Sequence, residues 1–144
     1  MAMRAWTPEM TREEAVLRAI SRVGEPGALA DEWNSEAPNC LQFVAWVYGY
    51  SLGDLSGRLG EIGSFWPQIR AYTGWPLRPA EEGPLPGDIL GLKFRFQWHV
   101  GIYTGGDRFV HVLGRQIRKS RLKYWRREVV GILAMPEPEE VEIT

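Results

Sequence analysis

A proline-rich segment over residues 76–87 constrains the fold more than any other part of the sequence, because it divides two residue patterns. It holds four of the ten prolines of this 144-residue chain. Proline ends helices and cannot donate to a sheet, so this segment is predicted to be an irregular connector. Residues before it show helical spacing, and residues after it form short strand-like runs. Helices followed by strands predict an α+β fold, in which N-terminal helices pack on a C-terminal antiparallel β-sheet.

Two helices are predicted well before the connector. Thr11 and Glu14 form a capping-box pattern at the start of the first helix, which Gly24 ends. Apolar residues follow at the spacing of one helix face, namely Val16, Leu17, Ile20 and Val23. A second helix is predicted over residues 40–48, with Asn39 as its N-cap. Its side chains are apolar almost all round, so it is expected to be buried on most sides.

A shorter helix is predicted over residues 64–71. Beyond the connector, five strands are predicted at short spacing, over residues 88–96, 98–103, 108–112, 116–120 and 129–135. We expect one domain over residues 1–136, followed by an acidic C-terminal tail over residues 137–144.

Cys40 is the only cysteine, so it cannot form a disulfide within the chain. It falls in the first turn of the predicted second helix, where backbone N–H groups are unpaired and the helix dipole favours an anion. Such a position lowers a thiol pKa and suits a nucleophilic thiolate. The alternative is a buried structural cysteine, which is common in protein cores.

The only two histidines, His99 and His111, lie in one predicted hairpin. A three-residue loop over residues 105–107 would place His111 opposite Gly101 and both histidines on one face of the sheet. The same register gathers the aliphatic side chains on the other face, namely Val100, Ile102, Val110 and Val112. Diagonal neighbours in a hairpin are within reach of each other's side chains, so one imidazole could act as a base that the other orients.

Three stretches resemble the NlpC/P60 family of papain-like cysteine peptidases. Residues 85–90 read Leu-Pro-Gly-Asp-Ile-Leu, and residues 99–111 read His-Val-Gly-Ile-Tyr-Thr-Gly-Gly-Asp-Arg-Phe-Val-His. The upstream Asn-Cys-Leu-Gln-Phe-Val over residues 39–44 matches the family's cysteine at a helix start. The resemblance covers about residues 38–135 and implies a papain-like fold.

The resemblance also implies acyl transfer through a Cys–His–His triad, in which Cys40 is the nucleophile, His99 the base and His111 the orienting residue. The expected reaction is cleavage of peptide or amide bonds in bacterial cell-wall peptidoglycan, with a possible place in phage tails. The backbone N–H of Cys40 is the expected oxyanion donor. The upstream tyrosine and the Asp-Cys-Ser-Gly stretch of the wall hydrolases are missing. The candidate substrate-binding residues are Trp33, Gln42 and Trp98, with Asn34 as a further replacement for the tyrosine.

Two alternatives remain open at this stage. The chain could be a differently specialised amidase, acyltransferase or thioesterase, or a non-catalytic binding or structural module of a larger assembly. No cofactor is expected, because the sequence has no phosphate-binding glycine motif. No metal is expected either, because the spacings typical of zinc ligands are missing.

Residues 115–127 carry seven basic side chains and no acidic one, although the formal net charge of the chain is −1. We favour a solvated strand edge; steering of an anionic substrate and nucleic-acid binding are the alternatives. No signal peptide and no membrane-spanning run is recognised, so we expect a soluble protein that is cytoplasmic or delivered by another system such as a phage virion. The oligomeric state is not indicated.

Overall fold

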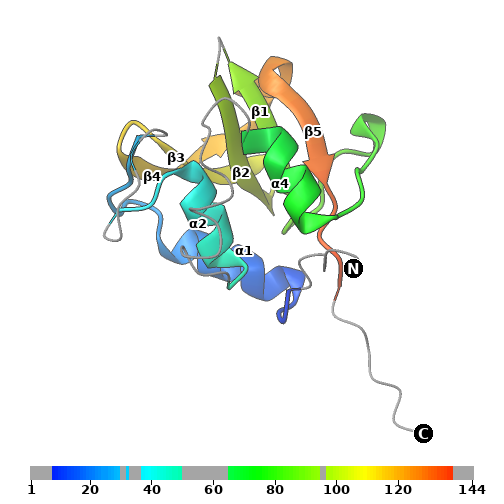
Figure 1. Cartoon of the computed structure of the whole chain (residues 1–144), viewed down its shortest axis with the longest axis horizontal. Coiled ribbons are helices and arrows are strands. Elements are labelled where there is room, and N and C mark those ends of the chain that lie inside the picture. The colour runs from blue at the N-terminus through cyan, green and yellow to red at the C-terminus, as the bar shows by residue number, and fades with distance from the viewer. Residues whose placement is uncertain (1–7, 30–31, 33–36, 50–64, 95–96, 138–144) are drawn as a thin grey trace, which may run out of the picture.

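The computed structural model describes residues 8–29, 32, 37–49, 65–94 and 97–137. Within these residues, three α-helices precede a five-stranded sheet whose strand order is β4-β3-β2-β1-β5 (Figure 1). Neighbouring strands of this sheet pair antiparallel. The helices are α1 (Arg12–Ser21), α2 (Cys40–Val47) and α4 (Phe65–Thr73), with short 3-10 helices η2 (Ala80–Glu82), η3 (Leu122–Tyr124) and η4 (Arg126–Glu128). The strands are β1 (Ile89–Phe94), β2 (Gln97–Gly105), β3 (Arg108–Leu113), β4 (Gln116–Arg121) and β5 (Val129–Leu133).

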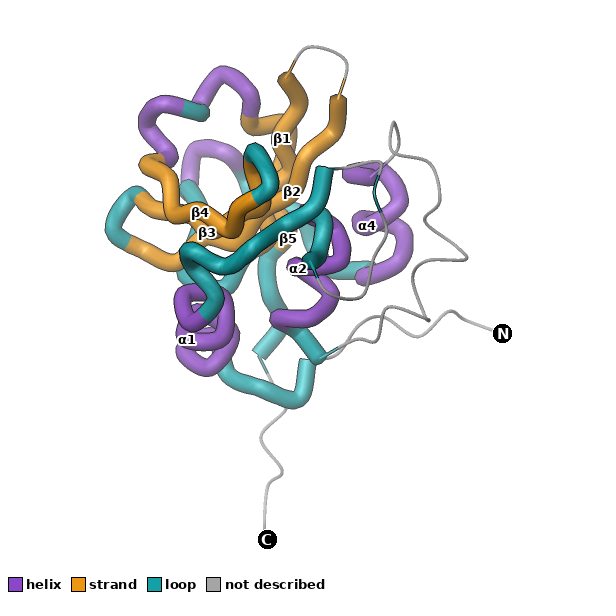
Figure 2. Tube along the Cα trace, turned by 90° about the vertical axis from the view of Figure 1, so that its left-hand side faces the viewer, coloured by secondary structure: helices purple, strands orange, loops and turns teal. Residues whose placement is uncertain are grey.

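The predicted α+β architecture is confirmed, and each of the five predicted strands corresponds to an observed one. Both α2 and α4 lie on one side of the strands (Figures 1 and 2). The larger core cluster fills the space between these helices and the sheet, and includes Phe43, Ile69 and Ile102. A smaller cluster around Phe109 lies on the other face, where Trp125 packs against it. The sheet is therefore buried on both faces along its middle strands.

Helix α1 begins as predicted, with the Thr11 side chain accepting the N–H of Glu14. Its predicted apolar face is wrong, because Leu17 is 60% exposed and the helix buries Ala15 and Ala19 instead. The small alanine side chains let the helix backbone approach the sheet closely, and the helix packs against β2 and α2. The helical spacing of the larger apolar side chains predicted that they would be buried, but the narrow space under the helix admits only alanine side chains.

One large ring of helix α4 lies directly on the backbone of the sheet. Trp66 lies against Gly91 of β1 and Gly131 of β5, two glycines that are register partners on adjacent strands. A Cβ atom on Gly91 would lie 2.3 Å from the Trp66 ring, and one on Gly131 would lie 2.4 Å from it. These contacts are far closer than packed carbon atoms allow. The two glycines therefore form the flat surface on which the indole rests.

Asp88 joins four parts of the chain at the start of β1. Its fully buried carboxylate accepts from Arg12 at 2.7 Å and from Arg78 at 2.7 Å. It also accepts the backbone N–H groups of Leu85 at 2.9 Å and Met135 at 3.0 Å. Burial by itself raises the pKa of the Asp88 carboxyl, but the donors outweigh it and the pKa lies below its ordinary value.

Arg12 also contacts the chain that follows β5. Its guanidinium also donates to the carbonyl of Met135 and forms an ion pair with Glu137 at 3.0 Å. Glu137 is the first residue of the predicted acidic tail; residues 138–144 of that tail lie outside the described residues. The start of α1 and the chain beyond β5 are consequently held side by side.

Candidate active site

Cys40 is the first residue of α2, and the residues around it form a buried capping box. The Asn39 side chain accepts the N–H of Gln42 at 2.9 Å, and the Gln42 side chain accepts the N–H of Asn39 at 2.9 Å. These reciprocal bonds hold the first turn of the helix in place and with it the thiol. The Gln42 side chain is only 2% exposed and its carbonyl oxygen is occupied by the Asn39 N–H. This burial corrects the prediction that Gln42 binds substrate.

The other predicted substrate-binding residues have different outcomes. Trp98 is half-buried and packs against the larger core, with the Lys93 ammonium 4.6 Å from its ring centroid. It is not among the residues that line the pocket described below. Trp33 and Asn34 lie outside the described residues.

The histidine hairpin has the predicted register but a different turn. Gly106 and Asp107 form a two-residue turn and both have positive φ, at 59° and 62°, as in a type I′ turn. A three-residue loop over residues 105–107 would set Thr104 opposite Arg108, but a register shift between Tyr103 and Gly105 pairs Gly105 with Arg108 instead. The extra residue restores the predicted pairing beyond it. A two-residue turn alone would have placed the histidines on opposite faces.

The two imidazoles meet on one face of the sheet. His99 Nε2 lies 2.7 Å from His111 Nδ1, and the far nitrogen of His111, Nε2, lies 2.8 Å from Ser120 Oγ. Three neighbouring strands, β2, β3 and β4, each contribute one residue to this chain of hydrogen bonds. A Cβ atom on Gly101 would lie 3.1 Å from the Cβ of His111, so the glycine leaves the space that the pair needs.

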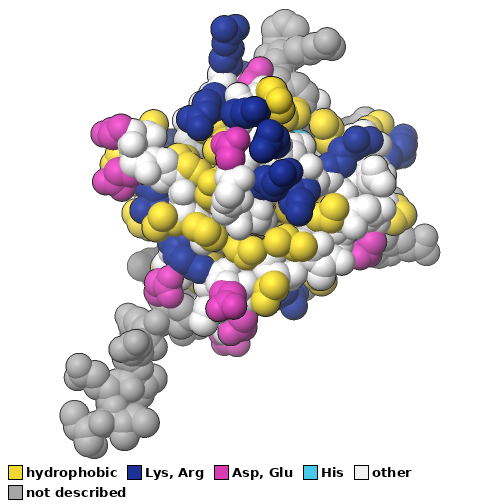
Figure 3. Space-filling model, turned by 180° about the vertical axis from the view of Figure 1, so that it is seen from behind, with side chains coloured by type: hydrophobic (Ala, Val, Ile, Leu, Met, Phe, Trp, Pro, Cys, Tyr) yellow, Lys and Arg dark blue, Asp and Glu magenta, His cyan; other side chains and the backbone are white. Residues whose placement is uncertain are grey.

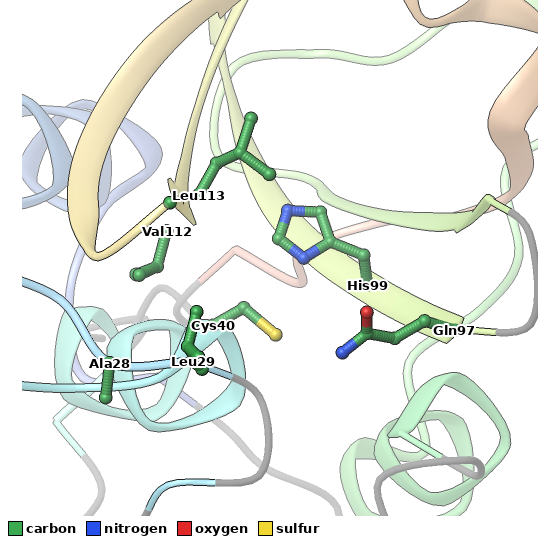
Figure 4. A pocket seen from close by; sticks show the side chains of 8 residues that line it. Ala28, Leu29, Cys40, Gln97, His99, Val112 and Leu113 are labelled. Carbon is green, nitrogen blue, oxygen red and sulfur yellow. The ribbon is translucent and has the colours of Figure 1, made fainter.

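A pocket opens where the start of α2 faces the sheet, and both Cys40 and His99 line it (Figure 4). The Cys40 sulfur and the His99 ring point toward each other across it. Because Nε2 of His99 bonds to His111, Nδ1 is the ring nitrogen on the side of the sulfur. The Gln97 amide is directed toward the same space. The rest of the lining is mostly apolar, namely Ala28, Leu29, Val112, Leu113 and Gly114.

The thiol and the imidazoles are neutral at pH 7. Burial raises the pKa of Cys40 to about 11, although backbone N–H groups, that of Val100 first, act in the opposite direction. Burial lowers the pKa of His99 to about 4. The pKa of His111 is also lowered, by burial first and then by the charges of His99 and Arg118. The thiolate expected from the helix start is therefore wrong for the unliganded site, because desolvation outweighs the helix N–H groups.

Such an arrangement can still perform base-assisted nucleophilic chemistry. A neutral imidazole is able to accept a proton, and the adjacent thiol has one to give. Two further polar residues belong to the site. Gln97 precedes His99 by two positions, so strand parity alone could have placed it on the same face. Ser120 could not be found this way, because its place depends on the pairing of a third strand.

Solved structures share this fold at low sequence identity. NlpC1 from Trichomonas vaginalis superposes with a TM-score of 0.62 at 17% identity, covering 92% of this chain and 48% of that one. The NlpC/p60 domain of the peptidoglycan hydrolase SagA gives 0.61 at 16% identity, covering 88% and 100%. The chain has the NlpC/P60 fold. An NlpC/P60 family protein from Bacillus cereus gives 0.63 at 16% identity, covering 92% and 44%.

The NlpC/P60 fold predicted from the motifs is thus confirmed. The chain spans about half the length of the Trichomonas protein and 44% of the Bacillus one. No protein-family model and no curated protein matches the sequence. Similarity at this level of sequence identity shows a shared fold and does not show a shared activity.

The basic stretch lies along β4, an edge strand, and the 3-10 helices that follow it. Arg115 forms an ion pair with Glu32 at 2.9 Å, and Arg126 lies 3.7 Å from Asp107. Lys and Arg side chains gather on the side of the molecule opposite to the view of Figure 1 (Figure 3). Among the described residues, no group of three potential metal ligands occurs and no helix is long and apolar enough to cross a membrane.

Proposed function

We propose that this chain is a cysteine hydrolase that cleaves peptide or amide bonds of bacterial peptidoglycan by acyl transfer. Cys40 is the nucleophile, His99 the general base and acid, and His111 the residue that orients His99. The observation that carries the proposal is the shared pocket of Cys40 and His99, with His99 Nε2 bonded to His111 Nδ1 at 2.7 Å. The expected location, either cytoplasmic or delivered by another system such as a phage virion, stays a prediction.

The neutral pair implies that proton transfer accompanies attack. When a substrate carbonyl enters, the Cys40 S–H gives its proton to His99 Nδ1 while the sulfur bonds to the carbonyl carbon. The resulting oxyanion lies near the start of α2, where the Cys40 N–H is a donor, and the Gln97 amide supplies a second. The protonated His99 then gives its proton to the leaving nitrogen, which leaves a thioester on Cys40. A water molecule, deprotonated by His99, hydrolyses that thioester.

The substrate class has two sources of support. SagA, whose NlpC/p60 domain has this fold, is a peptidoglycan hydrolase. The pocket also offers both an amide side chain, Gln97, and apolar surface, which suits a peptide backbone with short side chains. The apolar part favours a second candidate function, the hydrolysis or transfer of an aliphatic acyl group held as a thioester.

The test is digestion of purified peptidoglycan, with the released fragments identified by mass spectrometry. We expect new peptide or amine ends with the wild-type chain and none with Cys40→Ala, whose folding is checked by circular dichroism. His99→Ala should be equally inactive, and loss of His111 should reduce the rate less. Turnover of acyl thioesters without any release from peptidoglycan would replace the first proposal by the second. Inactivity on both would contradict the assignment as a hydrolase.

A further inference from the structure

The hydrogen-bond chain of the site does not end at His111. We propose that Ser120 is a positioning residue whose hydroxyl oxygen accepts the Nε2–H of His111 and so selects the ring tautomers that leave a lone pair on His99 Nδ1, facing Cys40. This inference rests on the proposed function and extends it by a fourth residue, contributed by the edge strand β4. Ser120 touches neither the substrate nor the sulfur and acts only through the two imidazoles.

The position of His111 leaves it few other partners. Its ring is fully buried, and its two nitrogens face His99 at 2.7 Å and Ser120 at 2.8 Å. Aromatic rings cover its sides, with centroids at 4.3 Å for Phe109 and 5.3 Å for Trp125. Ser120 itself is partly exposed. The state of the serine hydroxyl is therefore transmitted directly to the ring.

The direction of the bond between His111 and Ser120 determines which nitrogen of His99 carries a hydrogen. If His111 Nε2–H donates to Ser120, its Nδ1 is unprotonated and must accept Nε2–H from His99. His99 Nδ1 then carries a lone pair and is able to take the Cys40 proton. If the Ser120 O–H donates to His111 instead, every bond reverses and His99 carries its hydrogen on Nδ1. In that second state His99 cannot act as the base for Cys40.

A serine is suited to the first state because its hydroxyl has acceptor lone pairs as well as one rotatable hydrogen. It can accept from His111 and turn its own hydrogen away, toward the solvent side of the edge strand. Arg118, the register partner of His111 on β4, opposes positive charge on that ring. A proton taken from Cys40 is therefore kept on His99, where the leaving group needs it.

The chain offers a direct test, because it has only two histidines. Labelling with 15N-histidine gives two imidazoles, whose protonated and unprotonated nitrogens differ strongly in chemical shift. The matched variants are Ser120→Thr, which keeps the hydroxyl, and Ser120→Val, in which valine has nearly the shape of threonine but no hydroxyl. Ser120→Ala repeats the deletion in case the valine variant does not fold. Spectra are recorded at pH 7 without substrate.

We expect wild type and Ser120→Thr to carry hydrogen on Nε2 of both rings. Ser120→Val should show a mixed tautomer population at His99 and a kcat/KM lowered about tenfold, the order of effect of one lost hydrogen bond. An unchanged spectrum in the valine and alanine variants would overturn the inference, as would a changed spectrum with unchanged kcat/KM. Because the spectrum needs no substrate, it decides the role of Ser120 separately from whether the chain hydrolyses peptidoglycan.

Discussion

The buried thiol makes a quantitative prediction about the reactivity of Cys40. Its pKa is raised from 9.0 to about 11, so at any pH below 9 its thiolate fraction is about 100-fold lower than that of an ordinary cysteine. Iodoacetamide reacts with the thiolate only. Since Cys40 is the only cysteine, the alkylation rate of the whole chain reports this one group, and the chain unfolded in urea supplies the reference.

We expect the rate of the folded chain to rise about tenfold per pH unit from pH 6 to pH 10, without a plateau. Burial also hinders the reagent, so the shape of the pH profile, and not the absolute rate, measures the pKa. His99 is uncharged above about pH 5, because its own pKa is about 4. Replacing His99 with Ala should therefore remove no charge that favours the thiolate, and the profile should keep its shape.

A different profile would refute this reasoning. A plateau below pH 7 that disappears in His99→Ala would show a thiolate–imidazolium pair already formed in the unliganded protein. Desolvation would then be weaker than the structure implies, and the helix N–H groups stronger. The proton transfer coupled to substrate entry would no longer be needed.

Three predictions concern stability, measured by urea denaturation. Asp88→Asn should lower the free energy of unfolding by about 3 kcal/mol, since it leaves two arginines without their buried partner. Because the Asp88 pKa is lower in the folded than in the unfolded chain, the wild type should keep this contribution above the ordinary carboxyl pKa of 3.8 and lose it as the pH falls below that value. A stability difference between wild type and variant that does not shrink at acidic pH would contradict the assignment. Gly131→Ala should cost about 1–3 kcal/mol by overpacking against Trp66, and a cost that persists in a Trp66→Leu background would exclude this contact as the cause. On α1, Ala19→Leu should strongly lower the free energy of unfolding, because Ala19 is fully buried. Leu17→Gln should change that free energy by less than about 0.5 kcal/mol, because Leu17 is exposed. A larger effect of Leu17→Gln than of Ala19→Leu would mean that the helix buries its other face.

The sequence predicts the architecture well where one residue type dominates the local physics. The prolines of residues 76–87 separate helices from strands, and Asn39 marks the start of α2, because caps and breakers act within a few residues. The parity of the valine rows predicts that His99 and His111 share a face, which the structure confirms. This prediction survives a wrong turn type because the bulge at Thr104 and the shorter turn compensate for each other.

The parts that could not be predicted depend on contacts between distant residues. The buried face of α1 is decided by the width of the space beneath it, which no spacing within the helix encodes. Ser120 joins the site only because β4 pairs with β3 in one register. The neutral state of Cys40 reflects the full depth of its burial, whereas a helix start taken alone predicts the opposite shift.

The contacts of Arg12 have a consequence for how this unit could be built into longer polypeptides. One guanidinium holds the start of α1 against Met135, beyond the last strand, so the chain enters and leaves the fold at the same place. Sequence added at either side would be tethered at one common point, whichever end carries it. A circular permutant that joins these two points through a short glycine linker, and opens the chain at the partly exposed Gly83, should therefore keep the fold and the pocket.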